Sequence, residues 1–156
     1  MTASANLFDL LLGSDRDRDR VVIETADGKT WTFADLVAAS GRYANVLVAR
    51  GVKPGDRVAA QVEKSVANLV LYLATIRAGA VYLPLNTAYT ANELDYFLGD
   101  AEPRLVVCDP ARQTGIAGLV AGRDVAVETL DASGEGSLAD AAAAADPVVL
   151  CGDMNI

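Results

Sequence analysis

The sequence contains no histidine and only two cysteines, Cys108 and Cys151, among its 156 residues. The absence of histidine removes the commonest general base, the commonest metal ligand and every catalytic triad that contains this residue. The two cysteines are far apart and form no C-x-x-C pair, so the sequence supports neither a zinc site nor a redox dithiol. Two free thiols fit a reducing compartment.

Long apolar runs are also missing. No run reaches the roughly 18 apolar residues that indicate a membrane span. The N-terminus has no basic region followed by an apolar one, the pattern typical of a secretory signal. The sequence therefore predicts a cytoplasmic protein. Its 52% hydrophobic and 22% charged residues are typical of a globular chain, long enough for one domain with a sizeable core.

Positive charge is scarce in the second half of the chain. Residues 1–75 hold nine acidic and nine basic residues, whereas residues 76–156 hold twelve acidic and four basic ones, and the whole chain has a net charge of −8. Nucleic acids and anionic membranes would repel such a surface. The composition therefore indicates neither a nucleic-acid partner nor a membrane partner.

The first fifty residues predict two helices separated by a hairpin. Residues 5–12 form a short apolar helix, and the alternating charges of DRDRDR at 15–20 are typical of a solvated loop. Two β-rich segments, 21–25 and 30–33, flank an Asp-Gly turn and predict a hairpin. Thr32 is placed to cap the helix that follows, through a capping box closed by an acidic residue three positions later.

From residue 56 onward, strands alternate with helices. The predicted strands are 58–62, 80–85, 105–108 and 125–130. The helices between them start at capping residues, which are Ser65, Thr90 with Glu93, and Asp109 followed by Pro110. The third helix is expected to run from about 110 to 121. This alternation favours an α/β fold whose mostly parallel sheet has helices on both faces.

A glycine-rich motif, Gly134-Glu135-Gly136-Ser137-Leu138-Ala139, fits the pattern G-x-G-x-x-A between a predicted strand and a predicted helix. In dinucleotide sites such glycines let the backbone approach a pyrophosphate at the helix N-terminus. Here Glu135 and Asp131 would repel phosphate, and no further strand–helix unit completes the site. The sequence favours a flexible surface loop with Ser137 as the helix N-cap over a nucleotide site at 134–139.

An acidic cluster raises the alternative of paired catalytic carboxylates. It consists of Glu93, Asp95, Asp100 and Glu102. Capping explains Glu93, and Asp100 lies at a helix end, so a solvated helix face is the favoured interpretation.

Cys108 and three tyrosines have structural explanations too. Cys108 closes an apolar strand and is predicted to be an inert buried thiol, although the helix start at Asp109-Pro110 keeps a reactive thiol as the alternative. The tyrosines predicted to pack rather than to exchange protons are Tyr82, Tyr89 and Tyr96. The residues alone thus give an α/β domain and no site.

Several longer segments together resemble one family. They are TFADL at 32–36, ARGVKPGDRVA at 49–59, the stretch from EKSVANL to GDAEP at 63–103, and LVVCDP at 105–110. The chain resembles the N-terminal part of the AMP-forming acyl-CoA synthetases (the adenylating enzyme superfamily) over residues 6 to about 145. Within that superfamily, the sequence segments YLPLNTAYT, ELDYF, DAEP and VVCDP most resemble those of malonyl-CoA synthetases.

The resemblance implies a two-step ligase. Such enzymes join a carboxylate, here malonate, to ATP with release of pyrophosphate, and then pass the acyl group from AMP to the thiol of coenzyme A. Magnesium assists the first step. A carboxylate becomes an acylating agent only once AMP makes its oxygen a leaving group, and fixed cations and amide donors must hold the phosphates.

The family's catalytic motifs are absent from this sequence. They are a Ser/Thr/Gly-rich phosphate loop that ends in Lys-Gly, a Gly-x-Thr-Glu segment, a ribose-binding aspartate and a lysine of a small C-terminal domain. The predicted division is an N-terminal α/β subdomain at 1–145 and a terminal strand or tail at 146–156, which stops before the phosphate loop. No residue is therefore assigned a catalytic, cofactor-binding or metal-binding role.

Three interpretations follow from this departure. The first is a fragment of a malonyl-CoA synthetase-like ligase that is inactive alone and binds no ATP, Mg or CoA by itself. The second is a non-catalytic α/β interaction module, or one half of a split enzyme, that exposes an apolar edge and pairs with a separately encoded remainder which completes the sheet. The third is an independent nucleotide-binding protein that uses residues 134–139.

Overall fold

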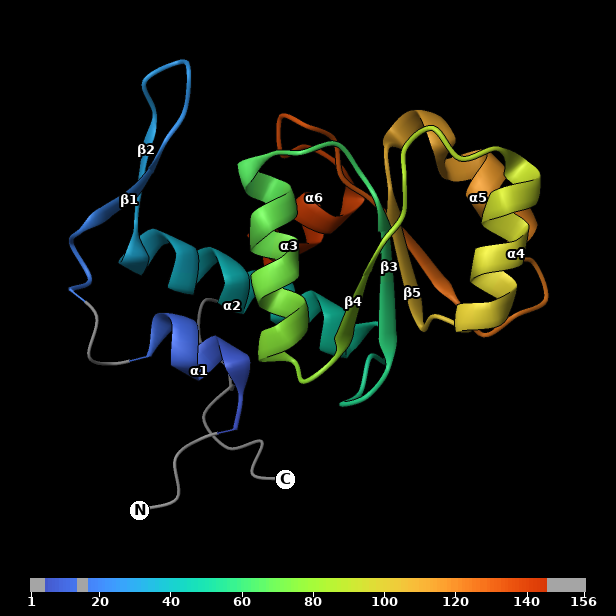
Figure 1. The fold of residues 1–156 in the computed structure, drawn as a ribbon, viewed down its shortest axis with the longest axis horizontal. Coiled ribbons are helices and arrows are strands. Elements are labelled where there is room, and N and C mark those ends of the chain that lie inside the picture. Colours follow the sequence, from blue (N-terminus) through green and yellow to red (C-terminus); the bar gives the residue numbers. More distant parts are fainter. Residues whose placement is uncertain (1–4, 14–16, 146–156) are drawn as a thin grey trace.

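The computed structural model describes residues 5–13 and 17–145 (Figure 1). The predicted tail at 146–156 and Cys151 lie outside the described residues. In chain order the elements are α1 (Leu7–Leu12), β1 (Val21–Glu24), β2 (Thr30–Thr32), α2 (Phe33–Ala49), β3 (Arg57–Gln61), α3 (Val66–Arg77), β4 (Val81–Pro84), α4 (Ala91–Ala101), β5 (Leu105–Cys108), the 3₁₀ helix η1 (Pro110–Arg112), α5 (Gln113–Leu119), β6 (Ala126–Thr129) and α6 (Ser137–Ala144).

The predicted hairpin and its turn are confirmed. β1 and β2 pair antiparallel, and Gly28 in the turn has a φ of 82°, a conformation that glycine adopts at little cost. The described part of the charged segment, residues 17–20, is a loop as predicted. The hairpin leads directly into α2, where Thr32 and Asp35 form the predicted capping box.

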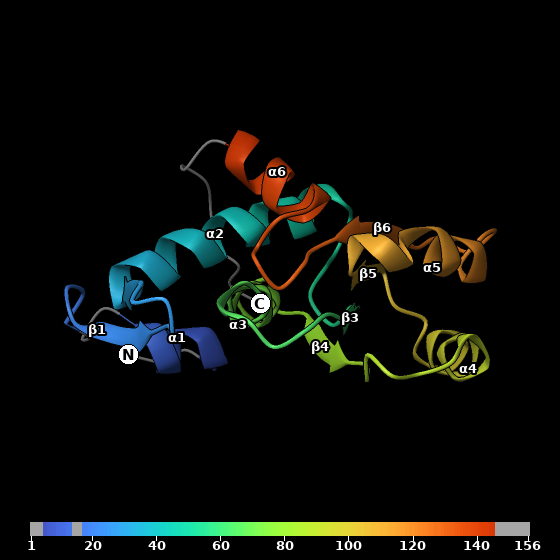
Figure 2. The same cartoon turned by 90° about the horizontal axis from the view of Figure 1, so that it is seen from above.

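A parallel sheet of four strands, in the order β4-β3-β5-β6, forms the centre of the molecule. Figure 2 shows α2, α3 and α6 on one face of this sheet and α4 and α5 on the other. The α/β class, the parallel sheet and the helices on both faces are therefore confirmed. Each crossover helix returns the chain to the same end of the sheet, which is what makes consecutive strands parallel.

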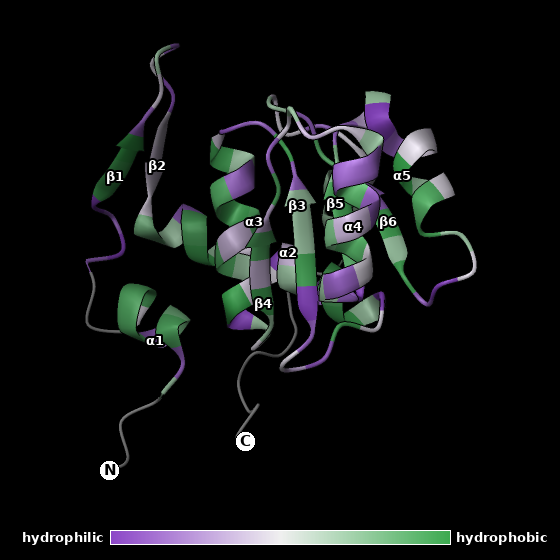
Figure 3. Ribbon diagram, turned by 45° about the vertical axis from the view of Figure 1, so that its right-hand side comes forward, coloured by the Kyte–Doolittle hydropathy of each residue, from purple (hydrophilic) through white to green (hydrophobic). Residues whose placement is uncertain are grey.

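Successive side chains of the central strands point to opposite faces of the sheet, so each face has its own hydrophobic core. Val58, Leu105 and Val107 pack into the core under α2, α3 and α6, whereas Ala59 and Val106 pack into the core under α4 and α5. All five side chains are buried, and Figure 3 shows the middle of β3 as hydrophobic between hydrophilic ends.

Helix α3 is buried from two sides. Leu71 and Ala74 belong to the core against the sheet, while Val70 and Leu73 belong to a third core formed with α1, α2 and the hairpin. Arg77 closes this third core, because its guanidinium lies 4.7 Å from the Phe8 ring centroid and donates a 2.8 Å hydrogen bond to the Val37 carbonyl.

Two predicted helix starts differ from the structure. The segment after Asp109 begins as η1 and continues as α5 only to Leu119, because a proline at the first position favours a tight opening turn and two glycines weaken the helix. Ser137 is not the N-cap of the last helix: Gly136 occupies that position, and Ser137 is the first helical residue.

The outer strands among those described are β4 and β6. Hydrogen bonds from Val81 N to Asp56 O and from Leu85 N to Ala60 O fix β4 against β3, so Tyr82 and Pro84 present their backbone to the open side. On β6, Ser137 Oγ accepts a 2.9 Å hydrogen bond from Thr129 N. Each outer strand thus has fewer free backbone N–H groups than a regular strand, which limits pairing with another chain.

Candidate functional site

The candidate site lies at the carboxyl ends of the parallel strands. The chain runs from β3 outward to β4, then returns across β3 to β5 and β6, so the topological switch falls between β3 and β5. In open α/β sheets, ligands bind in the crevice outside such a switch point. A cavity of about 340 Å³ occupies this place, lined by Gln61, Glu63, Thr87, Ala88, Asp109 and Arg112.

Gln61 brings an unsatisfied acceptor to this cavity. The residue ends β3 and is fully buried, and its Nε2 donates a 2.9 Å hydrogen bond to the Asn86 carbonyl. Its Oε1 has no hydrogen-bond partner in the described chain. A buried amide oxygen left without a donor is costly, so this atom favours a ligand or water that supplies one.

Charged side chains of both signs line the cavity, with Arg112 opposite in charge to Asp109 and Glu63. Arg112 Nη2 donates a 2.7 Å hydrogen bond to the Thr87 carbonyl, which joins the loop after β4 to the helix after β5. Asp109 caps η1 by accepting a 2.8 Å bond from the Ala111 backbone N–H. The Arg112 guanidinium keeps further N–H groups that suit an anionic or carbonyl oxygen.

Cys108 ends β5 beside this edge, and its side chain is buried. Burial, followed by the negative charge of Asp109, raises the pKa of its thiol to about 11, against the opposing influence of Arg112. A thiol with such a pKa stays protonated at neutral pH, and only the thiolate attacks electrophiles. The predicted burial of Cys108 is confirmed, and its raised pKa favours the inert thiol over the reactive alternative.

The glycine-rich motif folds as a turn that packs closely against β6 at Gly136. Gly136 has a φ of 137°, and a Cβ added there would lie 2.4 Å from the Thr129 carbonyl oxygen, so the turn is packed against its own strand. Asp131 occupies the other side, where its carboxylate accepts hydrogen bonds from the Ser133 and Glu135 backbone N–H groups. The backbone N–H groups of Ser133, Glu135 and Ser137 are therefore engaged within the loop and with β6.

A buried carboxylate also takes the place of a phosphate at the start of α6. Ser137 Oγ donates to Glu128 Oε2, and Arg50 Nε lies 2.5 Å from Glu128 Oε1. The Glu128 side chain is only 6% exposed. An added phosphate would meet this negative charge in a setting of low dielectric constant. The carboxylates of Glu128 and Asp131 therefore count against residues 134–139 as a nucleotide site, as the sequence analysis favoured.

The acidic cluster is spread over α4 as separate structural contacts. Glu93 completes the capping box with Thr90, Asp95 Oδ1 lies 3.2 Å from Arg123 Nη2, and Glu102 is the left-handed C-cap with a φ of 44°. Across residues 5–13 and 17–145, no three histidine, cysteine, aspartate or glutamate side chains are grouped as a metal site. The solvated helix face is the arrangement observed.

The three tyrosines differ in their surroundings. Tyr82 donates a 2.6 Å hydrogen bond to Asn68 Oδ1, and burial raises its pKa above the usual value. Tyr89 stacks on Phe97 at a centroid distance of 4.9 Å. Tyr96 touches Phe97 edge-on but is 67% exposed, so the packing prediction holds for the first two residues and only in part for the third.

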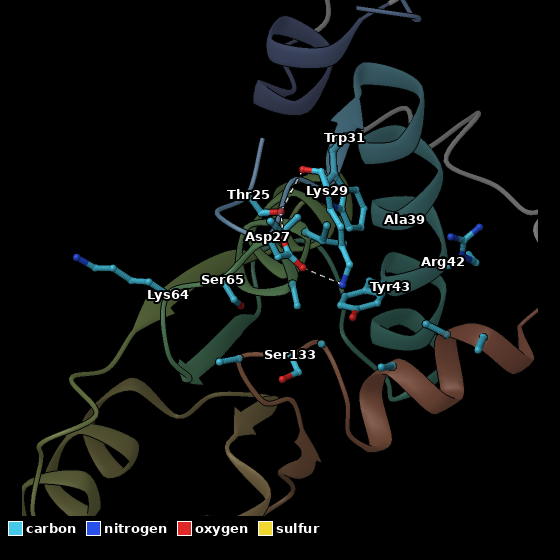
Figure 4. Close-up of a pocket in the computed structure, with 18 residues that line it drawn as sticks. Thr25, Asp27, Lys29, Trp31, Ala39, Arg42, Tyr43, Lys64, Ser65 and Ser133 are labelled. Carbon is cyan, nitrogen blue, oxygen red and sulfur yellow. Dashed lines mark hydrogen bonds and ion pairs between the residues drawn. The ribbon is translucent and has the colours of Figure 1, made fainter. Parts of the chain in front are cut away.

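A second and larger hollow lies on the opposite side of the helical layer. This cleft of about 640 Å³ is enclosed by the hairpin, α2, α3, α6 and the loop before α6. Figure 4 shows Trp31, Lys29 and Tyr43 along its wall, with Ser65 and Ser133 below. Lys29 is engaged with Asp27 at 3.3 Å, and Arg42 and Lys64 extend away from the centre of the cleft.

Sequence reasoning did not identify Gln61, Arg112 or the cleft at Trp31. One signal was available for the first: a glutamine inside the apolar strand VAAQV is out of place unless its amide has a partner. Arg112 and Trp31 carry no such signal, because their neighbours come from segments distant in the chain.

No helix in the described ranges is long and apolar enough to cross a membrane.

The profile of the family described as AMP-binding enzyme matches residues 13–151. The long-chain-fatty-acid–CoA ligase FadD13 of Mycobacterium tuberculosis (strain ATCC 25618 / H37Rv) is 33% identical over 143 residues, which cover 89% of this chain and 28% of that ligase.

Solved structures agree with the sequence matches. Apo MatB from Rhodopseudomonas palustris is 59% identical to this chain, with a TM-score of 0.91. The match covers 95% of this chain and 30% of the MatB chain. ATP-bound MatB from the same organism gives the same identity and TM-score over 94% of this chain and 29% of that one. The chain thus spans under a third of these relatives. It belongs to the AMP-binding enzyme family, and its fold is that of the N-terminal part of an acyl-CoA synthetase.

Proposed function

We propose that this chain is the N-terminal subdomain of an AMP-forming ligase that joins malonate to coenzyme A, and that it does not form the adenylate by itself. The observation that supports this most is the 59% identity to MatB over 95% of the chain. The malonate assignment rests on the resemblance of YLPLNTAYT, ELDYF, DAEP and VVCDP to malonyl-CoA synthetases.

The described residues do not fit the phosphates of ATP or their magnesium ion. The glycine-rich turn is closed by its own carboxylates, Asp131 and Glu128, and no acidic group of the described chain is arranged for a metal. Adenylation needs donors fixed where negative charge develops on the phosphates. The residues at 5–13 and 17–145 present no such arrangement, and we therefore derive no catalytic step on them.

What the chain contributes is one wall of a binding crevice. The carboxyl edge of the sheet offers an unpaired amide oxygen on Gln61, at the end of β3, and the guanidinium of Arg112, in η1 after β5. In the intact ligase such a wall would orient part of the substrate, which lowers the entropic cost of the reaction. A cytoplasmic location stays our prediction and fits the free Cys108 thiol.

The test is malonate-dependent exchange of pyrophosphate into ATP by the pure 156-residue protein. We expect no exchange above the protein-free background, while full-length MatB from Rhodopseudomonas palustris under the same conditions is active. Exchange by this chain alone, abolished when malonate is omitted, would overturn the proposal.

A second candidate function is an interaction module, or a split-enzyme half, that pairs with a separately encoded remainder. The observation that favours it is the size of the match: the fold is superposable over 95% of the chain but accounts for only 30% of MatB. Light scattering distinguishes the two cases, because a chain that requires a partner would self-associate when pure, whereas a self-sufficient one would be a stable monomer.

A further inference from the structure

We infer that α1 is a latch on the helical layer: it opens as a unit while the parallel sheet and its helices stay folded, and the Phe8 ring on the Arg77 guanidinium holds it closed. This inference goes beyond the proposed function and does not depend on it. Figure 1 and Figure 2 show α1 on the side of α3 that faces away from the parallel sheet. The third core, which α1 covers, contains no residue of β3, β4, β5 or β6 among those described.

Helix α1 is too short to persist unless it is docked. It has six residues, whereas isolated helices of fewer than roughly 12–15 residues are marginal in water. Phe8 and Leu12, one turn apart, are buried in the same core as Val70 and Leu73 of α3, while Leu7 is 44% exposed. The helix therefore docks through one short face. A segment docked in this way opens locally without unfolding the rest of the chain.

The seat of the Arg77 side chain is built by α2 and α3. Arg77 Nη1 donates hydrogen bonds to the Val37 carbonyl at 2.8 Å and to Ser40 Oγ at 3.4 Å. Gly41 makes room for the guanidinium, since a Cβ added there would lie 3.2 Å from Arg77 Nη1. None of these contacts involves α1, so the cation stays in place when α1 leaves. It offers the Phe8 ring a fixed partner 4.7 Å from the ring centroid.

One buried atom makes the closed state costly. Arg77 Nε is buried and has no hydrogen-bond partner in the described chain. A buried donor without an acceptor carries a desolvation cost, which water relieves once the site opens. The closed latch thus combines a favourable contact of the ring with the cation and an unfavourable burial of this N–H group. A small change in either one shifts the population of the open state.

The latch and the cleft at Trp31 share part of their walls. Ala39 and Val70 belong to the core that α1 covers and also line the cleft. Trp31 packs against the same core and is the one tryptophan of the sequence. Opening of α1 therefore removes packing from behind the cleft, and the fluorescence of Trp31 reports it.

Hydrogen exchange of the 156-residue chain tests whether α1 opens separately. We expect the amides of α1 to exchange at least 100-fold faster than those of α3, with little dependence on urea at concentrations that already speed exchange in α3. Equal protection of the two helices with the same urea dependence would overturn the inference. An α1 without any protection would contradict the closed state.

A substitution in the sheet separates the latch from global unfolding. Val107 is fully buried in the core between the sheet and α3, far from the core that α1 covers. Val107→Ala should speed exchange in α3 at least tenfold and leave exchange in α1 within twofold, because the sheet is intact in both states of the latch. The same factor in both helices would mean that α1 opens only when the whole chain unfolds.

The contact that closes the latch is tested at position 8 against a neighbouring control. Phe8→Ala should speed exchange in α1 at least tenfold and raise the quenching of Trp31 fluorescence by acrylamide at least twofold. Leu7→Ala, at a 44% exposed position of the same turn, should change neither by as much as twofold. Equal effects of the two variants on α1, or an unchanged quenching of Trp31 in Phe8→Ala, would count against the latch.

A double-mutant cycle isolates the part played by the cation. Arg77→Met keeps the apolar stem of the side chain and removes the charge, and Phe8→Leu keeps an apolar side chain and removes the ring. We expect Phe8→Leu to speed exchange in α1 by a factor roughly two to thirty times larger in the parent than in Arg77→Met. The same factor in both backgrounds would show that Arg77 does not hold the latch closed.

Discussion

Gly136 shows how a single residue decides between a ligand site and a structural turn. Its φ of 137° places the backbone against Thr129, and the neighbouring Ser137 then exchanges hydrogen bonds with Thr129 and Glu128. The spacing of glycines in this loop is the same as in a nucleotide site. This loop differs from a nucleotide site because the Glu128 carboxylate lies beside it. Glu128 is nine positions before Ser137, and the sequence does not indicate that the two residues are in contact.

Replacing Gly136 by alanine is expected to destabilise the protein by about 1–3 kcal/mol or more, since an added Cβ would meet the Thr129 backbone in a region of φ that alanine rarely adopts. Gly115→Ala is the matched control, because no atom lies within 4 Å of a Cβ there and alanine favours its helix. Urea unfolding of both variants gives the difference; a Gly136→Ala protein as stable as Gly115→Ala would contradict the geometry.

At the scale of elements, the helix starts are governed by local chemistry and were predicted most reliably. Thr32, Ser65 and Thr90 each accept a hydrogen bond from a backbone N–H three residues later, as their spacing predicted. The start at Ser137 was predicted wrongly, because its hydroxyl bonds to β6 instead. A capping prediction fails where a neighbouring strand competes for the same side chain.

Thr90→Ala should destabilise the protein by about 1 kcal/mol at pH 7, because it removes the cap of α4. Thr114→Ala, at an exposed position of α5, is the control and should change little.

Hydrogen bonds from the Thr90 backbone and side chain lower the pKa of Glu93 below 4.5. The part of the stability that comes from the Glu93 carboxylate is therefore present above about pH 4.5 and is lost as the pH falls through the lowered pKa.

Urea unfolding of the parent and of Glu93→Gln from pH 7 to pH 3 measures this carboxylate contribution. The difference in stability should be largest at pH 7 and should shrink toward pH 3. A difference that grows as the pH falls would contradict the sign derived for Glu93.

At the scale of the whole molecule, the alternation of strands and helices was enough to predict a parallel sheet between two helical layers. Every predicted strand in the described ranges from 58 to 130 is present. The candidate site was not predicted, because Gln61, Thr87 and Arg112 come together only through the order β4-β3-β5-β6. Periodicity reports which side chains are buried, but not which strand end lies beside which.

Packing of α3 between two cores predicts a steep contrast within one helix. Leu71 is fully buried between α2 and the sheet, whereas Leu69 is 38% exposed. Leu71→Ala should cost about 2–5 kcal/mol and Leu69→Ala less than about 1 kcal/mol. Calorimetric unfolding of both variants is the measurement; equal Tm values would indicate that α3 is not sandwiched as described.

The proline that ends β4 has a consequence for the behaviour of many copies of this chain together. The backbone of Pro84 faces the open side of an outer strand, and proline has no N–H to donate to a strand of a second chain. Stacking of strands into cross-β fibrils requires an unbroken ladder of donors along the template. Concentrated solutions of this protein should therefore resist seeded fibril growth at β4, even though half of the Val81 side chain is in contact with water.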